Sequence, residues 1–538
     1  MEQEEKPAID TTQEFNTIAL SLSGGGYRAS AFHLGAMAYL DKIDLLEKVT
    51  IISTVSGGSF TGGLYALYLS RGKSFQDCYD HLFKCMMEVD LIEEGLKTLS
   101  ERQSTDRIGS HNLINAMSDI YHRVFFDKAL FAEILEAKDL HLKELIINAT
   151  DFEFGLPFRF QASQSPLARI GNGGISIPLP AAKEMRLADL VASSSCFPGG
   201  FEPLKFPHDF IHSNETELSK LLNQPRFKTG IGLMDGGIVD NQGIESVLAA
   251  IERKGTVLPD LFIISDVSTS YMKPFEFPEE TGLDKMKFGL GMVNVLLIIG
   301  ACLVAATLVL FIASFYQLWQ AGDYIGLTSK ALGLLIISLL LFIFYKVQGI
   351  FRNDILGQIP RLGNKAWAYF KKISVGRVVD MTKLRAASML TMVNDVTMKQ
   401  IRRLIYNRVY KDKANRFQYS RVSNLIDSLT REKVIGRSNN SNYAHLVPSE
   451  DLLVVAEKAV NTATTLWFTE KEIEKGKLND LVASGEFTTC FRLVENIIQR
   501  YGIDSATYPP AIKKLYAQLL EDWKGFNDYP WMMVSPKG

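Results

Sequence analysis

An uncharged stretch of 35 residues, Phe288 to Gly322, constrains the fold of this 538-residue chain more than any other feature. A helix needs about 20 consecutive apolar residues to cross a bilayer. Buried helices of water-soluble proteins rarely stay free of charge over such a length. The stretch therefore predicts a membrane-spanning helix over about residues 288–315.

A second, shorter run predicts a second span. Ala331 to Tyr345 contains 15 residues without a charge, and it becomes long enough only if Tyr324 to Ser329 join it. The span would then cover about residues 326–345, with Lys330 extending its ammonium group toward the interface. A buried or re-entrant segment is the alternative for this run.

The charges around the two runs predict the orientation of a helical hairpin. The loop between the runs holds only Asp323 and Lys330 as charged residues. The outer flanks carry six basic residues, namely Lys285, Lys287, Lys346, Arg352, Arg361 and Lys365. By the positive-inside rule both flanks are cytoplasmic. We expect a two-span membrane protein whose soluble parts and termini lie on the cytoplasmic side.

Outside these runs the composition resembles that of a water-soluble protein. The formal net charge of -2 gives no general case for nucleic-acid binding. Five cysteines without CxxC spacing, and an N-terminus without a basic, apolar signal sequence, predict a reducing compartment. His208 and His212 lie beside Pro207, and an ordinary surface loop explains them better than a metal site. We expect no cofactor and no metal.

Apolar strand patterns alternate with helical patterns over residues 17–275, which is typical of an α/β domain with a mostly parallel sheet. A polar tail at 1–16 precedes this domain, and the hairpin region at 276–350 follows it. We expect a basic helical region at 351–440 that packs on or completes the domain, and a helical C-terminal region at 441–538. The basic surface is either solvated or attracted to anionic lipid. Self-association is compatible with the sequence, but no residue specifies it.

A serine follows one of the predicted strands. The β-branched run from Val49 to Val55 stops at Ser56-Gly57-Gly58 and continues as a helix pattern, which predicts a strand, a sharp turn and a helix. Such a turn exposes one hydroxyl at its tip, and Gly58 allows the backbone to fold tightly around it. This geometry suits a nucleophile. Ser53 and Ser59 are alternatives, but only Ser56 stands at the strand end with glycine two residues later.

A glycine triplet follows the first strand, and it has competing interpretations. Gly24, Gly25 and Gly26 begin a segment with the spacing of a dinucleotide-binding turn. That interpretation requires an acidic residue at the end of the second strand, where this chain has Ser-Gly-Gly. A Walker loop would need Gly-Lys-Ser/Thr. The triplet therefore favours an oxyanion hole built from backbone N–H groups. Arg28 either supports the loop, attracts a substrate phosphate or forms a structural ion pair.

The serine also needs a base. No histidine is a convincing partner on sequence grounds, whereas Asp235 follows an apolar stretch and precedes two glycines that permit a tight turn. A carboxylate within hydrogen-bonding reach of Ser56 could accept its proton and return it to the leaving group. Asp240 is a weaker candidate that we expect to form a cap or turn.

Together these motifs resemble the patatin-like phospholipases, relatives of the cytosolic phospholipase A family. The matches are the glycine triplet with Arg28, Ser56 with Gly58, Asp235-Gly236-Gly237 with Asn241, and an Ala/Ser-rich segment from Ala192 to Pro203. The resemblance covers about residues 17–270, and it implies a three-layer α/β fold with a Ser/Asp dyad. It also implies a hydrolase that cleaves fatty-acyl esters of phospholipids or lysophospholipids. Thr54 departs from the family's Gly-x-Ser-x-Gly elbow.

Two other functions are weighed against a membrane-anchored lipid acyl hydrolase. One is an α/β-hydrolase with a Ser-Asp-His triad that uses His445, although only one strand fits before Ser56 and that fold requires several. The other is a catalytically silent lipid-binding scaffold or sensor, for which Thr54 is the best support. Reaction of Ser56 with a fluorophosphonate would separate the enzyme from the scaffold.

Overall fold

The computed structural model describes residues 14–100, 112–213, 215–268, 290–322, 324–350, 375–410, 420–438 and 441–534. The chain divides into two compact units, one formed by residues 1–272 with 396–538 and the other by residues 273–395. The α/β domain expected at 17–275 is continued by the C-terminal part of the chain, and the region expected at 351–440 is shared between the two units.

A ten-stranded sheet lies at the centre of the first unit. Its order is β10-β9-β1-β2-β3-β4-β5-β6, and β8 pairs with both β3 and β7. Strands β10, β9, β1, β2 and β3 are parallel, whereas the remaining pairs are antiparallel. The strands are β1 (Ile18–Leu22), β2 (Val49–Val55), β3 (Glu144–Asp151), β4 (Leu156–Ser163), β5 (Ile170–Gly171), β6 (Ser176–Ile177), β7 (Leu204–Phe206), β8 (Ile231–Asp235), β9 (Leu261–Asp266) and β10 (Ser420–Leu425). The α/β class is confirmed, but the sheet is mixed rather than mostly parallel.

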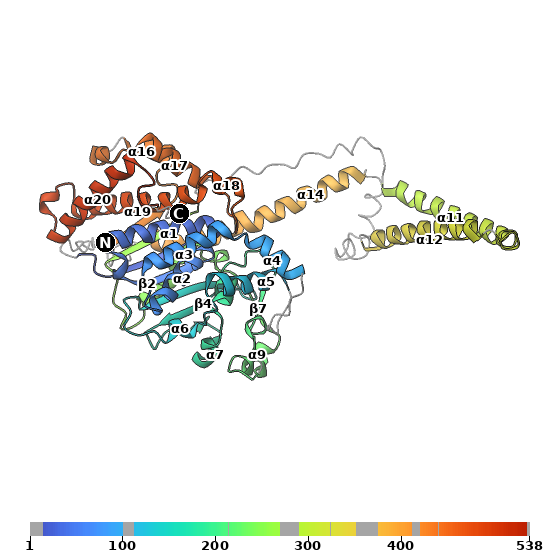
Figure 1. Ribbon diagram of the computed structural model, residues 1–538, viewed down its shortest axis with the longest axis horizontal. Helices are drawn as coiled ribbons and strands as arrows, with labels where there is room; N and C mark the ends of the chain where they lie inside the picture. Colours follow the sequence, from blue (N-terminus) through green and yellow to red (C-terminus); the bar gives the residue numbers. More distant parts are fainter. Residues whose placement is uncertain are drawn as a thin grey trace, which may run out of the picture. The chain divides into compact units, whose positions relative to one another are not determined.

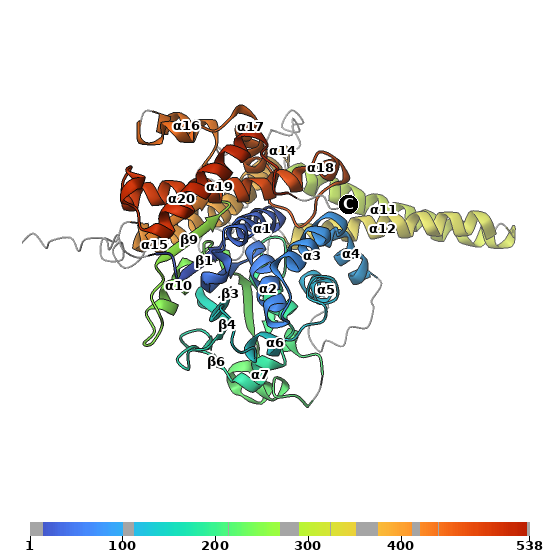
Figure 2. The ribbon, with the colours of Figure 1, turned by 60° about the vertical axis from the view of Figure 1, so that its left-hand side comes forward.

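The parallel strands are covered on both faces, which explains their continuous apolar sequences. Every residue of β1 and β9 is buried. Helices α1, α2 and α3 lie on one face, and α10 and α15 lie on the other (Figure 2). The helices of this unit are α1 (Gly26–Lys42), α2 (Gly57–Ser70), α3 (Phe75–Glu88), α4 (Leu91–Ser100), α5 (Leu113–Ile120), α6 (Ala132–Leu135), α7 (Leu179–Lys183), α8 (Leu187–Ser194), α9 (Pro225–Lys228), α10 (Ile244–Ile251), α15 (Met398–Tyr410), α16 (Arg431–Ser438), α17 (Glu450–Val460), α18 (Glu470–Glu474), α19 (Lys477–Tyr501) and α20 (Pro510–Asp528). The result is the expected three-layer arrangement.

Strand β10 lies in the region at 351–440 that we expected to be basic and mostly helical. Ser420 to Leu425 pairs in parallel with β9 at the edge of the sheet. Val422 and Asn424 are buried, while the residues between and beside them are partly exposed. This alternation is typical of an edge strand, but the many basic residues around it conceal the pattern in the sequence.

The C-terminal helices pack directly on the first helix of the sheet (Figure 1). Helices α1 and α19 approach so closely that a Cβ at Gly35 would lie 1.9 Å from the carbonyl oxygen of Val482. A Cβ at Gly485 would likewise lie 2.0 Å from the carbonyl oxygen of Phe32. Only glycine permits backbones to meet at this distance. Residues 477–501 are therefore part of the α/β domain's core.

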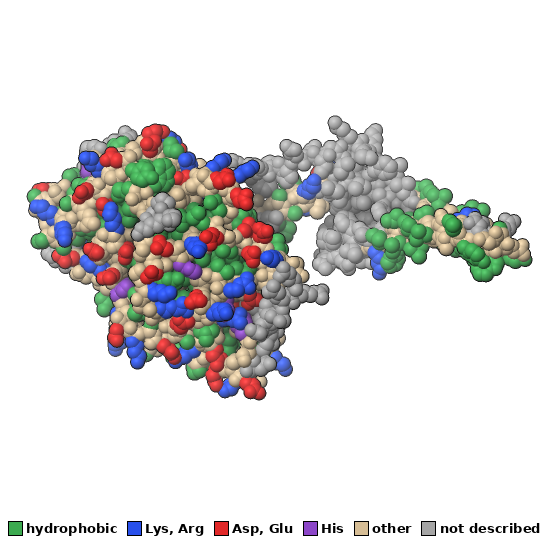
Figure 3. All heavy atoms as spheres, viewed as in Figure 1, with side chains coloured by type: hydrophobic (Ala, Val, Ile, Leu, Met, Phe, Trp, Pro, Cys, Tyr) green, Lys and Arg blue, Asp and Glu red, His purple; other side chains and the backbone are tan. Residues whose placement is uncertain are grey.

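The second unit contains α11 (Leu290–Gln320), α12 (Tyr324–Ile350) and α14 (Val375–Thr391). Ile298–Tyr316 and Tyr324–Ile343 are each long and apolar enough to cross a membrane, with mean hydropathies of 2.6 and 2.1. Their 19 and 20 residues would span about 30 Å at 1.5 Å per residue. Neither window is buried within the protein, and hydrophobic side chains dominate the surface of both helices (Figure 3).

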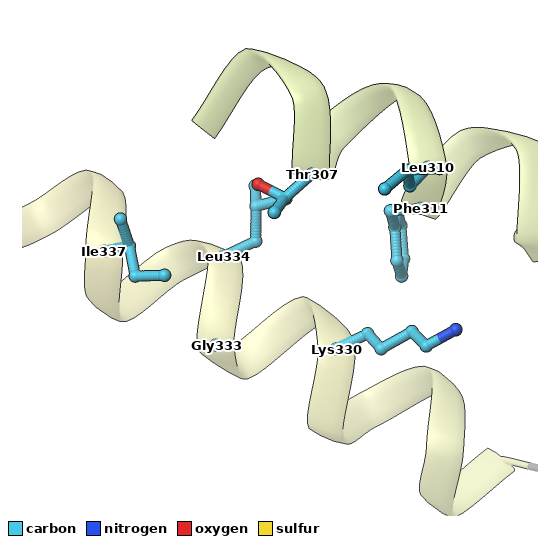
Figure 4. A pocket seen from close by; sticks show the side chains of 7 residues that line it. All are labelled: Thr307, Leu310, Phe311, Lys330, Gly333, Leu334 and Ile337. Carbon is cyan, nitrogen blue, oxygen red and sulfur yellow. The ribbon is translucent and has the colours of Figure 1, made fainter. Parts of the chain in front are cut away.

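Helices α11 and α12 pack against each other as a hairpin. A groove of about 340 Å³ between them is lined by Thr307, Leu310, Phe311, Lys330, Gly333, Leu334 and Ile337. The aliphatic chain of Lys330 lies along this groove, and its ammonium group points away from Leu334 and Ile337 (Figure 4). This is the direction expected of a lysine that reaches from an apolar environment toward an interface.

Candidate active site

Ser56 occupies a strained turn between β2 and α2. Its backbone has φ +49° and ψ -119°, a conformation that costs a non-glycine residue roughly 1–3 kcal/mol. The amide of Ser56 donates a hydrogen bond of 2.9 Å to the hydroxyl of Ser194 on α8, and that hydroxyl donates at 2.6 Å to the carbonyl of Asn148. The strained turn is thus held by partners on β3 and α8.

Thr54 has a defined role in supporting this turn. Its hydroxyl donates to the carbonyl of Ile146 at 3.2 Å and accepts from the hydroxyl of Ser59 at 3.0 Å. Ser59 also hydrogen-bonds the hydroxyl of Ser194 at 2.9 Å. A Cβ at Gly62 would lie 2.4 Å from the methyl group of Thr54, so glycine on α2 provides the space that threonine needs. The departure from a glycine elbow is therefore accommodated by its neighbours.

The alternative serines are engaged elsewhere. Ser53 is fully buried, donates to the carbonyl of Gly243 at 2.8 Å and accepts from Asn148 at 2.9 Å. Ser59 belongs to the network that supports Thr54. The hydroxyl of Ser56, in contrast, lies close enough to the Asp235 carboxylate to lower the pKa of that carboxyl. Among these three serines, Ser56 is the one beside a carboxylate that could accept its proton.

Asp235 lies at the end of β8, opposite Ala149 of β3. Its amide donates to the carbonyl of Cys196 at 2.9 Å, and its carboxylate accepts from the amide of Gly237 at 2.7 Å. Burial raises the pKa of Asp235 to about 6, and the bonds from Gly237 and Ser56 and the charge of Arg402 partly oppose this shift. The carboxylate is therefore more basic than an ordinary aspartate yet ionised at neutral pH.

The glycine triplet lies against the elbow. A Cβ at Gly57 would lie 2.1 Å from the carbonyl oxygen of Gly26, and one at Gly24 would lie 3.0 Å from the Cβ of Ser56. The amide of Gly24 donates to the carbonyl of Asn241 at 3.0 Å, so it is already occupied. Within the described parts of the chain, no group accepts a hydrogen bond from the amides of Gly25 or Gly26. These two amides, at the positive end of α1, are available to a developing oxyanion.

Arg28 supports the glycine loop through contacts with the end of α17. Its Nη1 donates to the carbonyl of Thr462 at 3.0 Å and to that of Val460 at 3.5 Å, at the end of α17. Burial lowers the pKa of this guanidinium, while Asp266 opposes the shift. The amide of Tyr27 also donates to the carbonyl of Thr465 at 2.8 Å. The segment after α17 therefore fixes the start of α1, and Arg28 serves this contact.

The other candidates have structural partners. Asp240 accepts hydrogen bonds from the amides of Gln242, Gly243 and Glu245 at the start of α10, in keeping with the expected cap. His445 lies 3.4 Å from the hydroxyl of Tyr516. His212 bonds Asp189 at 2.7 Å. No group of three or more His, Cys, Asp or Glu residues is arranged to hold a metal in the described ranges.

Ser194, Asn148 and Arg402 contribute to the site without having been predicted. Ser194 lies in the Ala/Ser-rich segment that resembles the family, but its sequence position did not reveal its bond to Ser56. Arg402 donates from Nε to the carbonyl of Gly237 at 2.6 Å across 165 residues of sequence. No local sequence signal links residues so far apart.

The fold and the site define an α/β protein with a serine on a strand–helix elbow beside a buried aspartate. Residues 20–248 match the model of the patatin-like phospholipase family. The family match includes the elbow, the glycine triplet and Asp235.

Solved structures that match the chain include human GIVD cytosolic phospholipase A2, at 12% identity and a TM-score of 0.31. That match covers 46% of this chain and 45% of the human chain, so the chain spans less than half of the human protein. VipD from Legionella pneumophila matches at 11% identity and a TM-score of 0.24, over 98% of this chain and 93% of VipD. No curated protein matches the chain in sequence.

Proposed function

We propose that the protein is a membrane-anchored lipid acyl hydrolase that uses Ser56 and Asp235. The observation that carries this proposal is the position of the Ser56 hydroxyl beside the buried Asp235 carboxylate, whose pKa it lowers. Ser56 Oγ attacks the carbonyl carbon of a fatty-acyl ester as Asp235 accepts its proton. The amides of Gly25 and Gly26 stabilise the tetrahedral oxyanion.

The remaining steps reuse the same groups. Collapse of the intermediate breaks the bond to the alcohol, and the alcohol oxygen takes the proton from Asp235. Asp235 then accepts a proton from water as the water attacks the acyl-enzyme. When the bond from the acyl carbon to Oγ breaks, Asp235 returns this proton to Ser56 and the fatty acid leaves. The raised pKa of Asp235 suits both directions of proton transfer.

The substrate proposed is a membrane phospholipid or lysophospholipid. Two unburied apolar helices support anchoring, because exposing them to water would be unfavourable. Anchoring holds the site near its substrate and raises the local lipid concentration. The basic residues that flank both helices support a cytoplasmic location for the catalytic domain and both termini.

The test uses the full chain in lipid nanodiscs. Wild type is expected to react with a fluorophosphonate at Ser56 and to release fatty acid from phospholipid or lysophospholipid. Ser56→Ala and Asp235→Asn are expected to lose both properties, whereas Ser100→Ala, at an exposed serine on α4, retains them. Mass spectrometry of the lipids identifies the ester cleaved.

The same experiment tests the lipid-binding scaffold. A protein that binds lipid but neither labels at Ser56 nor releases fatty acid would overturn the hydrolase proposal and favour the scaffold. Persistent hydrolysis by Ser56→Ala would assign the activity to another nucleophile.

A further inference from the structure

Arg402 on α15 reaches the turn that carries Asp235. Its Nε donates to the carbonyl of Gly237 at 2.6 Å, while the amide of Gly237 donates to the Asp235 carboxylate at 2.7 Å. A Cβ at Gly237 would lie 3.3 Å from Nη2 of Arg402, so the guanidinium covers this turn closely. One side chain thus contacts the peptide that orients the proposed base.

Helix α15 is itself fixed to the domain. One turn after Arg402, Tyr406 packs on the second face of the sheet against a buried cluster that includes Ile244 and Val247 of α10. The helix also contacts the 3-10 turn at Gly236–Ile238. Arg402 is therefore presented by packed structure rather than by a free loop.

We propose that Arg402 is a positioning residue of the Ser56–Asp235 site, which fixes the Asp235–Gly237 turn and favours the ionised form of the base. This inference rests on the proposed function. Arg402 lies outside the family match at 20–248 and follows the apolar hairpin in the chain. A part of the chain beyond that match therefore completes the site.

The charges around Asp235 determine whether loss of Arg402 raises or lowers the pKa of this carboxyl. Arg402 of α15 is the cation that lowers the pKa of this carboxyl against the effect of burial. Cys196, after α8, also faces Asp235, and burial raises the pKa of its thiol so that it stays neutral. Asp240 faces the amides at the start of α10. Loss of the Arg402 charge should therefore raise the pKa of Asp235.

The test measures the rate of fluorophosphonate labelling of Ser56 against pH in the full chain in nanodiscs. For wild type, the rate should fall below a pH of about 6, as Asp235 gains a proton. We call this fall in rate at low pH the acid limb of the profile. For Arg402→Gln, the acid limb should move upward by about one pH unit, which is the low end of the pKa shifts that loss of an opposite charge produces. The change in ionisation would then slow labelling about tenfold near pH 5, whereas near pH 8.5 Arg402→Gln should be slowed only as much as Arg402→Lys, by loss of the bond from Nε.

Two further variants separate the charge from the hydrogen bond. Arg402→Lys keeps the positive charge but loses the bond from Nε, so we expect slower labelling at every pH without a shift of the limb.

Arg403→Gln removes the same charge from the exposed neighbouring residue and should match wild type. Asp240→Asn should leave the limb in place, which assigns it to Asp235 rather than to the other carboxyl with a pKa of about 6.

The outcomes distinguish this inference from the proposed function. If wild type labels at Ser56 and Ser56→Ala does not, but the profiles of Arg402→Gln and Arg403→Gln coincide, the role of Arg402 is refuted while the hydrolase stands. A uniform loss in Arg402→Gln with no movement of the limb also refutes it, since that result indicates only a structural role. If Arg402→Gln does not fold, the test depends on Arg402→Lys, which keeps the charge. A displaced acid limb in Arg402→Lys would refute the charge effect, whereas slower labelling with an unshifted limb would support it. Absence of labelling in wild type refutes the proposed function itself.

Discussion

The amide of Ser56 donates a hydrogen bond of 2.9 Å to the hydroxyl of Ser194, a residue 138 positions later in the chain. Ser194 in turn donates to the carbonyl of Asn148 at 2.6 Å. A serine with positive φ is unfavourable in isolation, and these bonds keep it in place. The elbow therefore depends on α8 and β3 as much as on its own sequence.

Removal of the Ser194 hydroxyl should weaken the elbow. In Ser194→Ala the buried amide of Ser56 loses its partner, which should destabilise the domain by roughly 1–3 kcal/mol and slow fluorophosphonate labelling. Thermal unfolding and labelling rates measure the two effects. Ser193→Ala is the matched control, because the Ser193 hydroxyl donates only to the carbonyl of Leu190 in its own helix. Wild-type labelling by Ser194→Ala would contradict the role of this bond.

Thr54 should contribute through its hydroxyl. Thr54→Val keeps the shape of the side chain but removes the acceptor of the Ser59 hydroxyl and the donor to Ile146, so we expect a loss of about 1–2 kcal/mol. Thr54→Ser, which keeps the hydroxyl, should lose less. Thr54→Gly would restore a glycine elbow, yet it should be less stable than wild type because it leaves space beside Gly62. A Thr54→Gly variant more stable than wild type would show that the threonine is not adapted to this site.

Hydrolysis should depend on the ionisation of Asp235. Its pKa of about 6 predicts that kcat/KM falls as the pH drops below this value, because the protonated carboxyl cannot accept the proton of Ser56. The pH profile of lipid hydrolysis measures the limb. Asp235→Asn should be inactive at every pH. A profile without an acid limb between about pH 5 and 7 would argue against Asp235 as the base.

Glu486 should lower stability at neutral pH. It is fully buried on α19, both of its carboxyl oxygens lack a hydrogen-bond partner in the described part of the chain, and burial raises its pKa well above the usual value. At a pH below the pKa of glutamate in the unfolded chain, Glu486 holds its proton in both the folded and the unfolded state. As the pH rises past that value the unfolded state ionises while the folded state keeps its proton, so stability falls.

Glu486→Met should therefore stabilise the domain by roughly 1–3 kcal/mol near pH 7.5, with a smaller gain near pH 4. Thermal unfolding at both pH values measures this difference. Glu521→Met on the exposed surface of α20 should change stability by less than about 0.5 kcal/mol. A destabilised Glu486→Met would indicate that the carboxyl has a favourable partner.

Cys302 reports on membrane insertion. It is exposed on α11 within Ile298–Tyr316, whereas the other four cysteines are buried. If α11 spans the membrane, lipid surrounds Cys302, and in sealed membranes a water-soluble maleimide should leave it unmodified. Ser100→Cys, on the surface of the catalytic domain, should react only when the reagent reaches the cytoplasmic side. Rapid modification of Cys302 from water would contradict the spanning helix, and reaction at position 100 from outside would contradict the orientation.

The local motifs of the site could be predicted from the sequence because each is a short segment with its own conformational requirement. A β-branched run followed by Ser-Gly-Gly permits few structures other than a strand, a turn and a helix. The glycine triplet and Asp235-Gly236-Gly237 likewise limit the backbone near their own positions. The two apolar helices follow from length and composition alone.

Contacts between distant segments could not be predicted in this way. Strand β10 forms because β9 offers an edge to pair with, and its short alternating pattern lies among basic residues typical of a solvated helix. The amide of Gly24 belongs to the predicted triplet, but its bond to Asn241 leaves Gly25 and Gly26 as the available donors. Arg28 could be assigned to loop support only when its carbonyl partners at the end of α17 were known.

The sequence by itself determined that this chain has a serine elbow, a glycine-rich turn, an aspartate turn and two helices able to span a membrane, because these features depend on neighbouring residues. Only the tertiary structure decided that Ser56 lies beside Asp235, that Ser194 accepts the hydrogen bond of the Ser56 amide and that Arg402 reaches the carbonyl of Gly237. The physical reason is that hydrogen bonds and charges act over a few ångströms in space. The folded sheet, not the order of residues, brings these groups within that distance.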